Sequence, residues 1–272
     1  MTPARILIIA GSDAGGGAGI QADIKTVTAL GGYAMTAITA LTAQNTLGVQ
    51  GVRSVEPAFI REQMRAVLDD LGADCIKTGM LQDAATIDAV VDELMARGGH
   101  IPLVVDPVMV AQSGDPLVDD AAMAHLRESL IPRAHLITPN IPEAQVLLGR
   151  QITRAEAMPA AAEALLELGC RAVLLKGGHL SGETLQDVLA TPAGSKLIEH
   201  RRIDTRSDHG TGCTLASAIA EGLGRGLDLL SAVERGGDYL QRALQTASAL
   251  GHGHGPVNHA HTVQAFGLTS RG

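Results

Sequence analysis

Short apolar runs of strand-forming residues alternate with longer amphipathic runs, and this alternation constrains the fold more than any other feature of the chain. The apolar runs are nearly continuous, as expected for strands buried on both faces, whereas the amphipathic runs have helical spacing. Strands are predicted over residues 5–10, 33–41, 75–77, 103–106, 136–138 and 172–176. The pattern predicts an α/β fold with a central, mostly parallel sheet and helices on both faces.

Helices are expected between and after these strands. They are predicted over residues 20–30, 58–71, 84–97, 121–129, 142–148, 154–168, 214–224 and 229 to about 250. Residues 184–204 are expected to add strands near one edge of the sheet. No linker or repeat is evident, so residues 1–272 are predicted to form a single domain. Residues 262–272 carry little pattern, and we expect this tail to be loosely ordered.

Composition excludes several classes of partner. The formal net charge is −8 and no run of lysine or arginine occurs, which argues against nucleic-acid binding. Tyr33, Phe59, Tyr239 and Phe266 are the only aromatic residues, too few for a surface on which bases stack. No run of about 18 apolar residues indicates a membrane span, and the first apolar run is too short for a signal peptide.

The three cysteines, Cys75, Cys170 and Cys213, are odd in number and widely spaced. They offer neither a disulfide framework nor the paired spacing of a zinc site. A reducing cytoplasm is therefore the expected location. The histidines of residues 252–261 are interspersed with glycines and lack a nearby cysteine, so we expect a solvent-exposed loop there and no metal site.

Polar residues follow each predicted strand, where ligands gather in open α/β sheets. A glycine-rich loop (residues 11–19) follows the first strand, and it lacks the arrangement of a Walker phosphate loop. Its spacing fits a looser dinucleotide motif, but no acidic residue follows between Asp23 and Glu56 to bind a ribose. The loop could still bring its backbone close to a small flat ligand, or it could be a turn only.

A second glycine-rich segment, His209–Leu215, runs directly into an apolar helix. Free N–H groups at the start of such a helix form an anion site. Cys213 lies at this positive end, where the helix dipole is expected to lower the pKa of its thiol and to favour thiolate. The segment thus predicts an anion cradle together with a base. The alternative is an ordinary glycine turn with Cys213 as core filler.

Asp106 and Glu143 are the best candidates for Mg²⁺, which prefers oxygen ligands and bridges substrate phosphates. Alternatively, Asp106 caps a turn before Pro107 and Glu143 favours the first turn of its helix. Asn140 also fits a turn. Lys176 ends an apolar strand, so its ammonium group either reaches phosphates or extends from the strand end to solvent.

Taken together, these motifs resemble the hydroxymethylpyrimidine/phosphomethylpyrimidine kinases, the thiamin-biosynthesis branch of the ribokinase-like superfamily. The matching segments occur in the family's order between residues 11 and 261. They are GSDAGGGAGIQADIKT, TAITALTAQNTLGV, KTGML, DPVMVAQSGD, LITPNIPEA, KGGHL, HGTGCTLASAIA and GHGPVNHAH. The AQNT and HGTGCT segments are specific to this branch, since sugar kinases of the superfamily have an aspartate as base.

This resemblance implies a ribokinase-like fold, ATP and Mg²⁺ as cofactors, an aminopyrimidine as substrate, and a homodimer. Such a kinase phosphorylates the hydroxymethyl group of the pyrimidine and then the monophosphate. The implied catalytic residues are Cys213 as base and the backbone of residues 210–213 (Gly210, Thr211, Gly212 and Cys213) as anion hole. Asp106 and Glu143 would organise Mg²⁺, and Asn140, Lys176 and Thr211 would bind the nucleotide. Substrate contacts are implied for Gln44, Gly11, Asp23, Ala18, Met80 and Val108.

Two positions depart from the family's pattern. Gly237 stands where a lysine that contacts phosphate is expected, with Arg235 or Arg242 as conceivable substitutes. Asp208 brings a carboxylate next to the anion loop, where it would repel a nucleotide unless it points to solvent. The resemblance leaves two alternatives open: a pyridoxal kinase, with dual activity included, and a non-catalytic sensor of pyrimidine or nucleotide.

Overall fold

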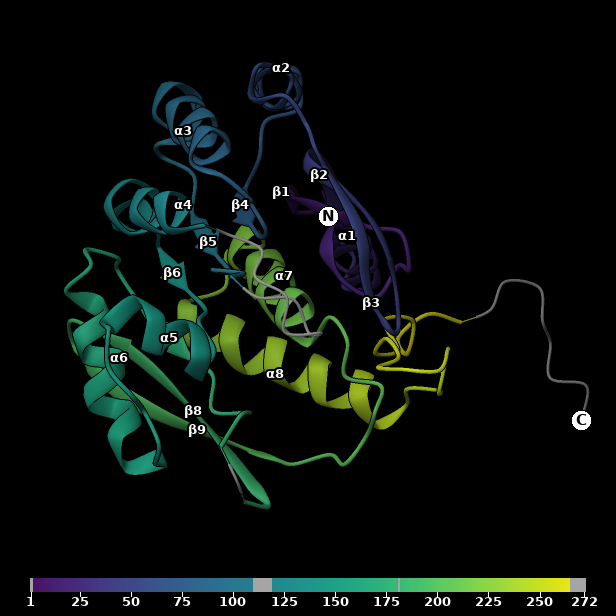
Figure 1. Ribbon diagram of the computed structural model, residues 1–272, viewed down its shortest axis with the longest axis vertical. Helices are drawn as coiled ribbons and strands as arrows, with labels where there is room; N and C mark the ends of the chain where they lie inside the picture. The colour runs from purple at the N-terminus through teal and green to yellow at the C-terminus, as the bar shows by residue number, and fades with distance from the viewer. Residues whose placement is uncertain (1, 110–118, 181, 265–272) are drawn as a thin grey trace, which may run out of the picture.

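One sheet joins all strands of the described residues. The computed structural model describes residues 2–109, 119–180 and 182–264 (Figure 1). The strands are β1 (Arg5–Asp13), β2 (Tyr33–Asn45), β3 (Gly48–Ser54), β4 (Cys75–Thr78), β5 (Leu103–Val105), β6 (Leu136–Ile137), β7 (Val173–Leu175), β8 (Thr184–Thr191) and β9 (Gly194–Arg201). Within these residues the strand order is β3-β2-β1-β4-β5-β6-β7-β8-β9.

The six strands predicted from apolar runs are confirmed. In the sheet they lie in the order β2-β1-β4-β5-β6-β7, and each pairs in parallel with its neighbour. The antiparallel hairpin of β8 and β9 extends one edge, as expected for residues 184–204. The antiparallel strand β3 at the other edge was not predicted. Its sequence, GVQGVRS, contains two glycines and little apolar alternation, so its pairing with β2 is what makes it a strand.

The helices begin close to their predicted positions. They are α1 (Gly19–Ala29), α2 (Pro57–Leu68), α3 (Ala84–Glu93), α4 (Asp120–His125), α5 (Ile141–Leu148), α6 (Met158–Leu166), α7 (Thr211–Gly224) and α8 (Leu229–Gln245). A π-helical turn prolongs both α3 and α4. The prediction for α8 was too long, because the chain leaves the helix at Thr246.

Helices cover both faces of the sheet, as predicted (Figure 1). Successive residues of β1 point to opposite faces: Leu7 and Ile9 pack in one apolar cluster, and Ile6 and Ile8 in the other. The first cluster includes side chains of α2 to α6, and the second includes those of α1, α7 and α8. Buried aliphatic side chains on both faces thus fix the rim where the parallel strands end.

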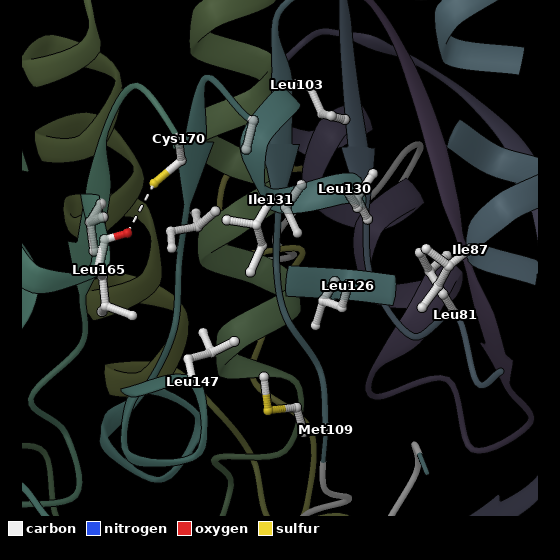
Figure 2. Packing of buried hydrophobic residues seen from close by; sticks show 14 of the residues in the cluster. Leu81, Ile87, Leu103, Met109, Leu126, Leu130, Ile131, Leu147, Leu165 and Cys170 are labelled. Atoms are coloured by element: carbon white, nitrogen blue, oxygen red, sulfur yellow. Dashed lines mark hydrogen bonds between the residues drawn. The ribbon is translucent and has the colours of Figure 1, made fainter. Parts of the chain in front are cut away.

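The larger cluster anchors a loop at that rim. Figure 2 shows Met109 close to Leu147, at one end of a set of buried aliphatic side chains. Met109 lies three residues after Asp106, so its burial fixes the path of the chain beyond β5. Cys170 packs in the same cluster and donates a hydrogen bond to the carbonyl oxygen of Leu165. Burial raises the pKa of the Cys170 thiol to about 11.

Several expectations concern parts of the chain that are only partly described. Residues 110–115 of the DPVMVAQSGD segment and residues 265–272 of the predicted tail lie outside the described residues. Within the described part, Cys75, Cys170 and Cys213 are free thiols. None of the described helices combines the length and the apolar character needed to cross a membrane.

Candidate active site

A cleft of about 710 Å³ lies where the parallel strands end. Its size suits small-molecule ligands, for which pockets of about 300–1,000 Å³ are usual. All but one of the site residues predicted from the sequence line it. These are Gly11, Ala18, Gln44, Met80, Asp106, Val108, Asn140, Glu143, Lys176, Gly210, Thr211, Gly212 and Cys213. The exception is Asp23.

Asp13, at the end of β1, shapes the first glycine-rich loop. Its carboxylate accepts hydrogen bonds from the backbone N–H groups of Gly15, Gly17 and Ala18, at 2.8–2.9 Å. Although burial opposes the charge, the His209 side chain and these N–H groups hold the pKa of Asp13 below its usual value. The loop is therefore folded around a buried carboxylate, with Ala18 facing the cleft.

The two glycine-rich loops touch each other. A Cβ atom at Gly210, where φ is +84°, would overlap the carbonyl oxygen of Gly17. His209 Nε2 lies 3.0 Å from Asp13 Oδ2 and 3.3 Å from Gln44 Nε2. Sequence reasoning missed Asp13 and His209 as site residues. A buried histidine between two loops leaves no sequence signal beyond its position beside a glycine.

The segment before the C-terminal tail braces both loops. The backbone N–H of His209 donates to the carbonyl oxygen of Gly255 at 3.0 Å, and Pro256 packs against Gly17. His254 donates its backbone N–H to Thr46, between β2 and β3, at 2.9 Å. The predicted exposed loop is therefore tied to the site. Among the described residues, no group of three or more histidine, cysteine or acidic side chains is arranged to hold a metal ion.

The start of α7 brings backbone N–H groups to the cleft, and that of Thr211 donates to the carbonyl oxygen of Asp208 at 3.4 Å. Gly210 is the N-cap, and no side chain caps the first turn. A Cβ atom at Gly212 would lie 3.3 Å from Lys176 Nζ and 3.6 Å from Asp106 Oδ2. The missing side chain leaves room for an anion between the helix N-terminus and the Lys176 ammonium group. This arrangement fits the anion cradle that the sequence predicts.

Cys213 lines the cleft at this helix end, but its thiol is not acidic. Burial raises the pKa of Cys213 to about 12, against the lowering effect of the Lys77 ammonium group. The carboxylates of Asp23 and Asp106 also raise it. The predicted lowering of the thiol pKa by the helix dipole is therefore wrong for the free protein, because removal from water outweighs the dipole.

Asp106 and Lys176 form a pair at the ends of β5 and β7. Lys176 Nζ lies 3.2 Å from Asp106 Oδ1, which also accepts a hydrogen bond from Thr138 Oγ1 at 2.9 Å. Burial opposes the charge on Asp106, yet Lys176 and Lys77 keep its pKa below the usual value. Burial likewise opposes the Lys176 charge, but Asp106 and Glu143 raise its pKa. Lys176 therefore lies in the cleft, not in bulk solvent.

Asn140 and Glu143 form a capping box at the start of α5. Asn140 Oδ1 accepts from the Glu143 N–H at 2.9 Å, and Glu143 Oε2 accepts from the Asn140 N–H at 2.8 Å. The structural alternatives for both residues are thus realised. Both also line the cleft, so a capping role does not remove them from the site.

The carboxylate of Glu143 lacks a full counter-charge. Burial and the Asp106 carboxylate raise its pKa to about 7, with Lys176 and the N–H of Asn140 acting in the opposite direction. A divalent cation near Asp106 and Glu143 would supply that charge. Two carboxylates fit Mg²⁺ when water and phosphate oxygens complete its coordination shell.

Asp23 lies behind the cleft and not in it. Its two oxygens lie 2.9 and 3.0 Å from Lys77 Nζ, and Oδ1 accepts from Ser217 Oγ at 2.6 Å. The Asp23 and Lys77 side chains are fully buried, although Lys77 borders the cleft. Burial favours the neutral form of Lys77, but Asp23 and Cys213 raise the pKa of its ammonium group. Asp23 thus holds Lys77 in the interior at the edge of the cleft, where its charge influences the pKa of Cys213. Sequence reasoning did not identify Lys77 as a site residue.

The far part of the cleft lies between the β8–β9 hairpin and α8. Gly237, the position without the expected lysine, lies here. Arg235 does not replace that lysine, because it pairs with the buried Glu221. Arg242 is exposed and does not line the cleft. Asp208 lines the cleft, and its Oδ1 lies 2.7 Å from His254 Nδ1.

Comparisons with known proteins agree with this architecture. The model of the family described as phosphomethylpyrimidine kinase matches residues 13–258. The chain is 48% identical to the hydroxymethylpyrimidine/phosphomethylpyrimidine kinase of Rhizobium meliloti, over 94% of this chain and 96% of that protein. It is 50% identical to the thiamine biosynthesis bifunctional protein ThiED of Geobacter sulfurreducens over 93% of this chain. The match covers 52% of that relative, so this chain spans about half of its length.

Solved structures show the same fold. A phosphomethylpyrimidine kinase from Clostridium difficile is 40% identical, with a TM-score of 0.79 over 89% of this chain and 99% of that chain. An ADP complex of Bacillus subtilis pyridoxal kinase is 32% identical, with a TM-score of 0.87 over 95% and 98%. The chain therefore belongs to the phosphomethylpyrimidine kinase family and is a kinase of the ribokinase-like fold.

Proposed function

We propose that the protein transfers the γ-phosphoryl group of ATP to 4-amino-5-hydroxymethyl-2-methylpyrimidine and then phosphorylates the monophosphate. One observation carries this proposal: the uncapped N-terminus of α7 faces Lys176 and Asp106 across a space that the missing side chain of Gly212 leaves open. A transferring phosphoryl group needs such positioning and charge stabilisation more than it needs covalent chemistry.

The pyrimidine is proposed to bind beside the first glycine-rich loop. Gln44 presents an amide that can hydrogen-bond to the ring edge, and it is held in place by Thr42 Oγ1 at 3.1 Å. Ala18, Met80 and Val108 supply apolar walls. At Gly11 a Cβ atom would overlap the end of the Met80 side chain, so glycine there lets Met80 approach the backbone.

The nucleotide phosphates are proposed to lie between the α7 N-terminus and Lys176. Backbone N–H groups of Thr211, Gly212 and Cys213 would hold the migrating group, and the side chains of Asn140 and Thr211 would orient the phosphates. Asp106 and Glu143 would hold Mg²⁺, which when bound neutralises charge on the phosphate oxygens. Lys176 would keep its contact with Asp106 and offer its remaining hydrogens to the phosphates.

Cys213 is proposed as the base that takes the proton of the substrate alcohol. The bond between oxygen and phosphorus forms as the bond to the leaving ADP oxygen breaks, and the alcohol proton passes to Cys213 Sγ as thiolate. Because burial raises the pKa of Cys213 to about 12, its thiolate is a minor form at neutral pH. In a loose transition state the alcohol loses its proton late, so proton removal contributes less to the rate than positioning and charge stabilisation do.

The deciding experiment is turnover with magnesium-ATP and the aminopyrimidine, with monophosphate and diphosphate resolved by chromatography. Accumulation of diphosphate supports both proposed steps and shows that glycine is tolerated at residue 237. Monophosphate alone contradicts the second step. Ligand binding without any product contradicts the proposed reaction and favours the sensor alternative.

A pyridoxal kinase is the second candidate. The observation that favours it is the TM-score of 0.87 to the Bacillus subtilis pyridoxal kinase, together with the shared hydroxymethyl group of the two substrates. Turnover of pyridoxal under the same conditions separates the candidates. A ratio of kcat/KM that favours pyridoxal would overturn the pyrimidine assignment. We also propose a homodimer in the cytoplasm, as the family resemblance implies, and light scattering after size exclusion tests the dimer.

A further inference from the structure

Two adjacent glycines of α8 face different neighbours. A Cβ atom at Gly236 would lie 3.0 Å from Ile219 and 3.4 Å from Leu215, so this glycine allows close packing of α8 on α7. A Cβ atom at Gly237 would instead lie 2.8 Å from Cε1 of His200. The absence of a side chain at residue 237 therefore makes room for an imidazole that comes from another element.

His200 belongs to β9 and is held by a carboxylate from β8. Its Nε2 lies 3.5 Å from Asp187 Oδ2, and the histidine side chain is 17% exposed. Asp187 Oδ1 in turn accepts a hydrogen bond of 2.8 Å from the backbone N–H of Gly177, the residue after Lys176. The His200 ring is thus connected to the strand end that carries Lys176, and His200, Asp187 and Gly237 all line the cleft.

The carboxylates around His200 favour its charged form. Asp187 from β8 and Asp238 from α8 raise the pKa of the imidazole, against the effect of burial. Arg202, two residues further along, is directed elsewhere, because its guanidinium group donates to the carbonyl oxygens of Gly178, Leu180 and Gly182. With Nε2 turned to Asp187, the second ring nitrogen, Nδ1, is the one left to meet a ligand.

We propose that His200 is a nucleotide-binding residue, whose imidazolium group donates a hydrogen bond to a phosphate oxygen from the position that Gly237 leaves open. The inference rests on the proposed function, since it needs a nucleotide in this part of the cleft. In this arrangement His200, on the facing strand, supplies the positive charge that a lysine at residue 237 would otherwise supply. It also accounts for the glycine at residue 237 of α8, which contacts the His200 ring and not the neighbouring helix α7.

The test is the affinity for magnesium-ADP, measured by calorimetry without any pyrimidine. His200→Ala is expected to weaken binding about 10-fold, the usual size for loss of one charge-assisted hydrogen bond. His200→Gln keeps a side chain of similar size without the charge and is expected to behave in the same way. His125→Ala is the matched control, because it removes another histidine–aspartate pair, with Asp88, that does not line the cleft.

The pH dependence separates binding from a structural role. The advantage of the wild type over His200→Gln is expected to be largest near pH 6 and to disappear towards pH 9, as the imidazole loses its proton. Because the phosphates of ADP titrate in the same way with both proteins, their contribution cancels in the ratio of the wild-type affinity to the His200→Gln affinity. A constant ratio over this range, or unchanged affinity in His200→Gln, would overturn the inference.

A rescue tests the position. Gly237→Lys alone brings a side chain into contact with the His200 ring, whereas the double variant His200→Ala, Gly237→Lys frees that space. The double variant is expected to recover most of the lost affinity and to bind ADP with little dependence on pH below 9. Failure to recover in a folded double variant contradicts the assignment. Normal ADP binding without phosphorylation of the aminopyrimidine would contradict the proposed function alone.

Discussion

His209 Nε2 lies 3.0 Å from Asp13 Oδ2, although 196 positions separate the two residues in the chain. This contact joins the loop after β1 to the loop before α7. Asp13 also organises the first loop through three backbone N–H groups. The two glycine-rich loops that line the cleft are therefore held together by one buried pair.

Removal of the Asp13 carboxylate is expected to impair catalysis more than stability. In Asp13→Ala, three backbone N–H groups lose their acceptor and His209 loses its partner, so both loops shift. We expect kcat/KM to fall about 100-fold, since small misplacements of reacting groups cost this much. Asp83→Ala is the control, because Asp83 caps α3 through the N–H of Thr86, away from the cleft. Equal effects of the two variants on kcat/KM would disprove this role.

The buried Lys77–Asp23 pair predicts an asymmetric loss of stability. Lys77→Met leaves the Asp23 carboxyl group buried without its counter-charge, and we expect the free energy of unfolding to fall by about 3–5 kcal/mol in urea titrations. The double variant Lys77→Met, Asp23→Asn removes both charges and is expected to regain a large part of that loss. The exposed pair Lys196–Glu234 provides the comparison, where Lys196→Met should cost less than about 1 kcal/mol. Equal losses in the single and double variants would contradict the prediction.

His259 is expected to make the fold sensitive to acid. Burial lowers the pKa of His259 to about 4, and its Nε2 lies 3.0 Å from Thr214 Oγ1. Between pH 6.5 and 4 the unfolded chain binds a proton that the folded chain does not. Stability therefore falls as pH decreases through this window, by at most about 3 kcal/mol.

His259→Asn should flatten this part of the stability profile, measured by urea denaturation at several pH values. The exposed His100→Asn is the control and should follow the wild type. A profile for His259→Asn that is parallel to the wild type would show that other groups cause the loss in acid.

The pKa of Cys213 predicts the pH dependence of turnover. If the thiolate is the base, kcat is expected to rise with pH throughout the range from about 7 to 9, because the thiol titrates only near 12. Cys213→Ala should lose about 100-fold or more in kcat and also lose this slope. Near-wild-type turnover in Cys213→Ala would show that positioning alone carries the reaction. Cys213→Ser, which replaces the thiol by a hydroxyl group of similar size, controls for the loss of packing.

The fold could be predicted from the sequence because burial on both faces leaves a readable pattern. Strands such as β1 and β5 are mostly or entirely apolar, so their order and the polar residues after them indicate a ligand-binding rim. The edge strand β3 could not be predicted, because backbone pairing with β2 stabilises it without an apolar signature. The length of α8 was overestimated, since residues after Gln245 contain helix formers but leave the helix.

The site could be predicted where a strand end, a helix start or a glycine-rich loop determined the position of a residue. Lys176 and Asp106 end their strands and meet in the cleft, as expected. Asp23 was misplaced because the sequence does not show that Lys77, 54 positions away, draws its carboxylate into the interior. The acidity of Cys213 was also misjudged, since burial depends on residues that converge from several elements. His200 carries no sequence signal, because its role depends on the space beside Gly237.

The bracing of both glycine-rich loops by residues 254–256 has a consequence for biosynthesis. Gly17 is synthesised long before the Gly255 carbonyl that holds His209 and the Pro256 ring beside Gly17. A nascent chain on the ribosome can form most of the parallel sheet while its loops lack this support. Phosphorylation activity should therefore arise only after residue 256 has left the ribosome, and a stop codon shortly before residue 254 should yield a folded sheet without a working catalyst.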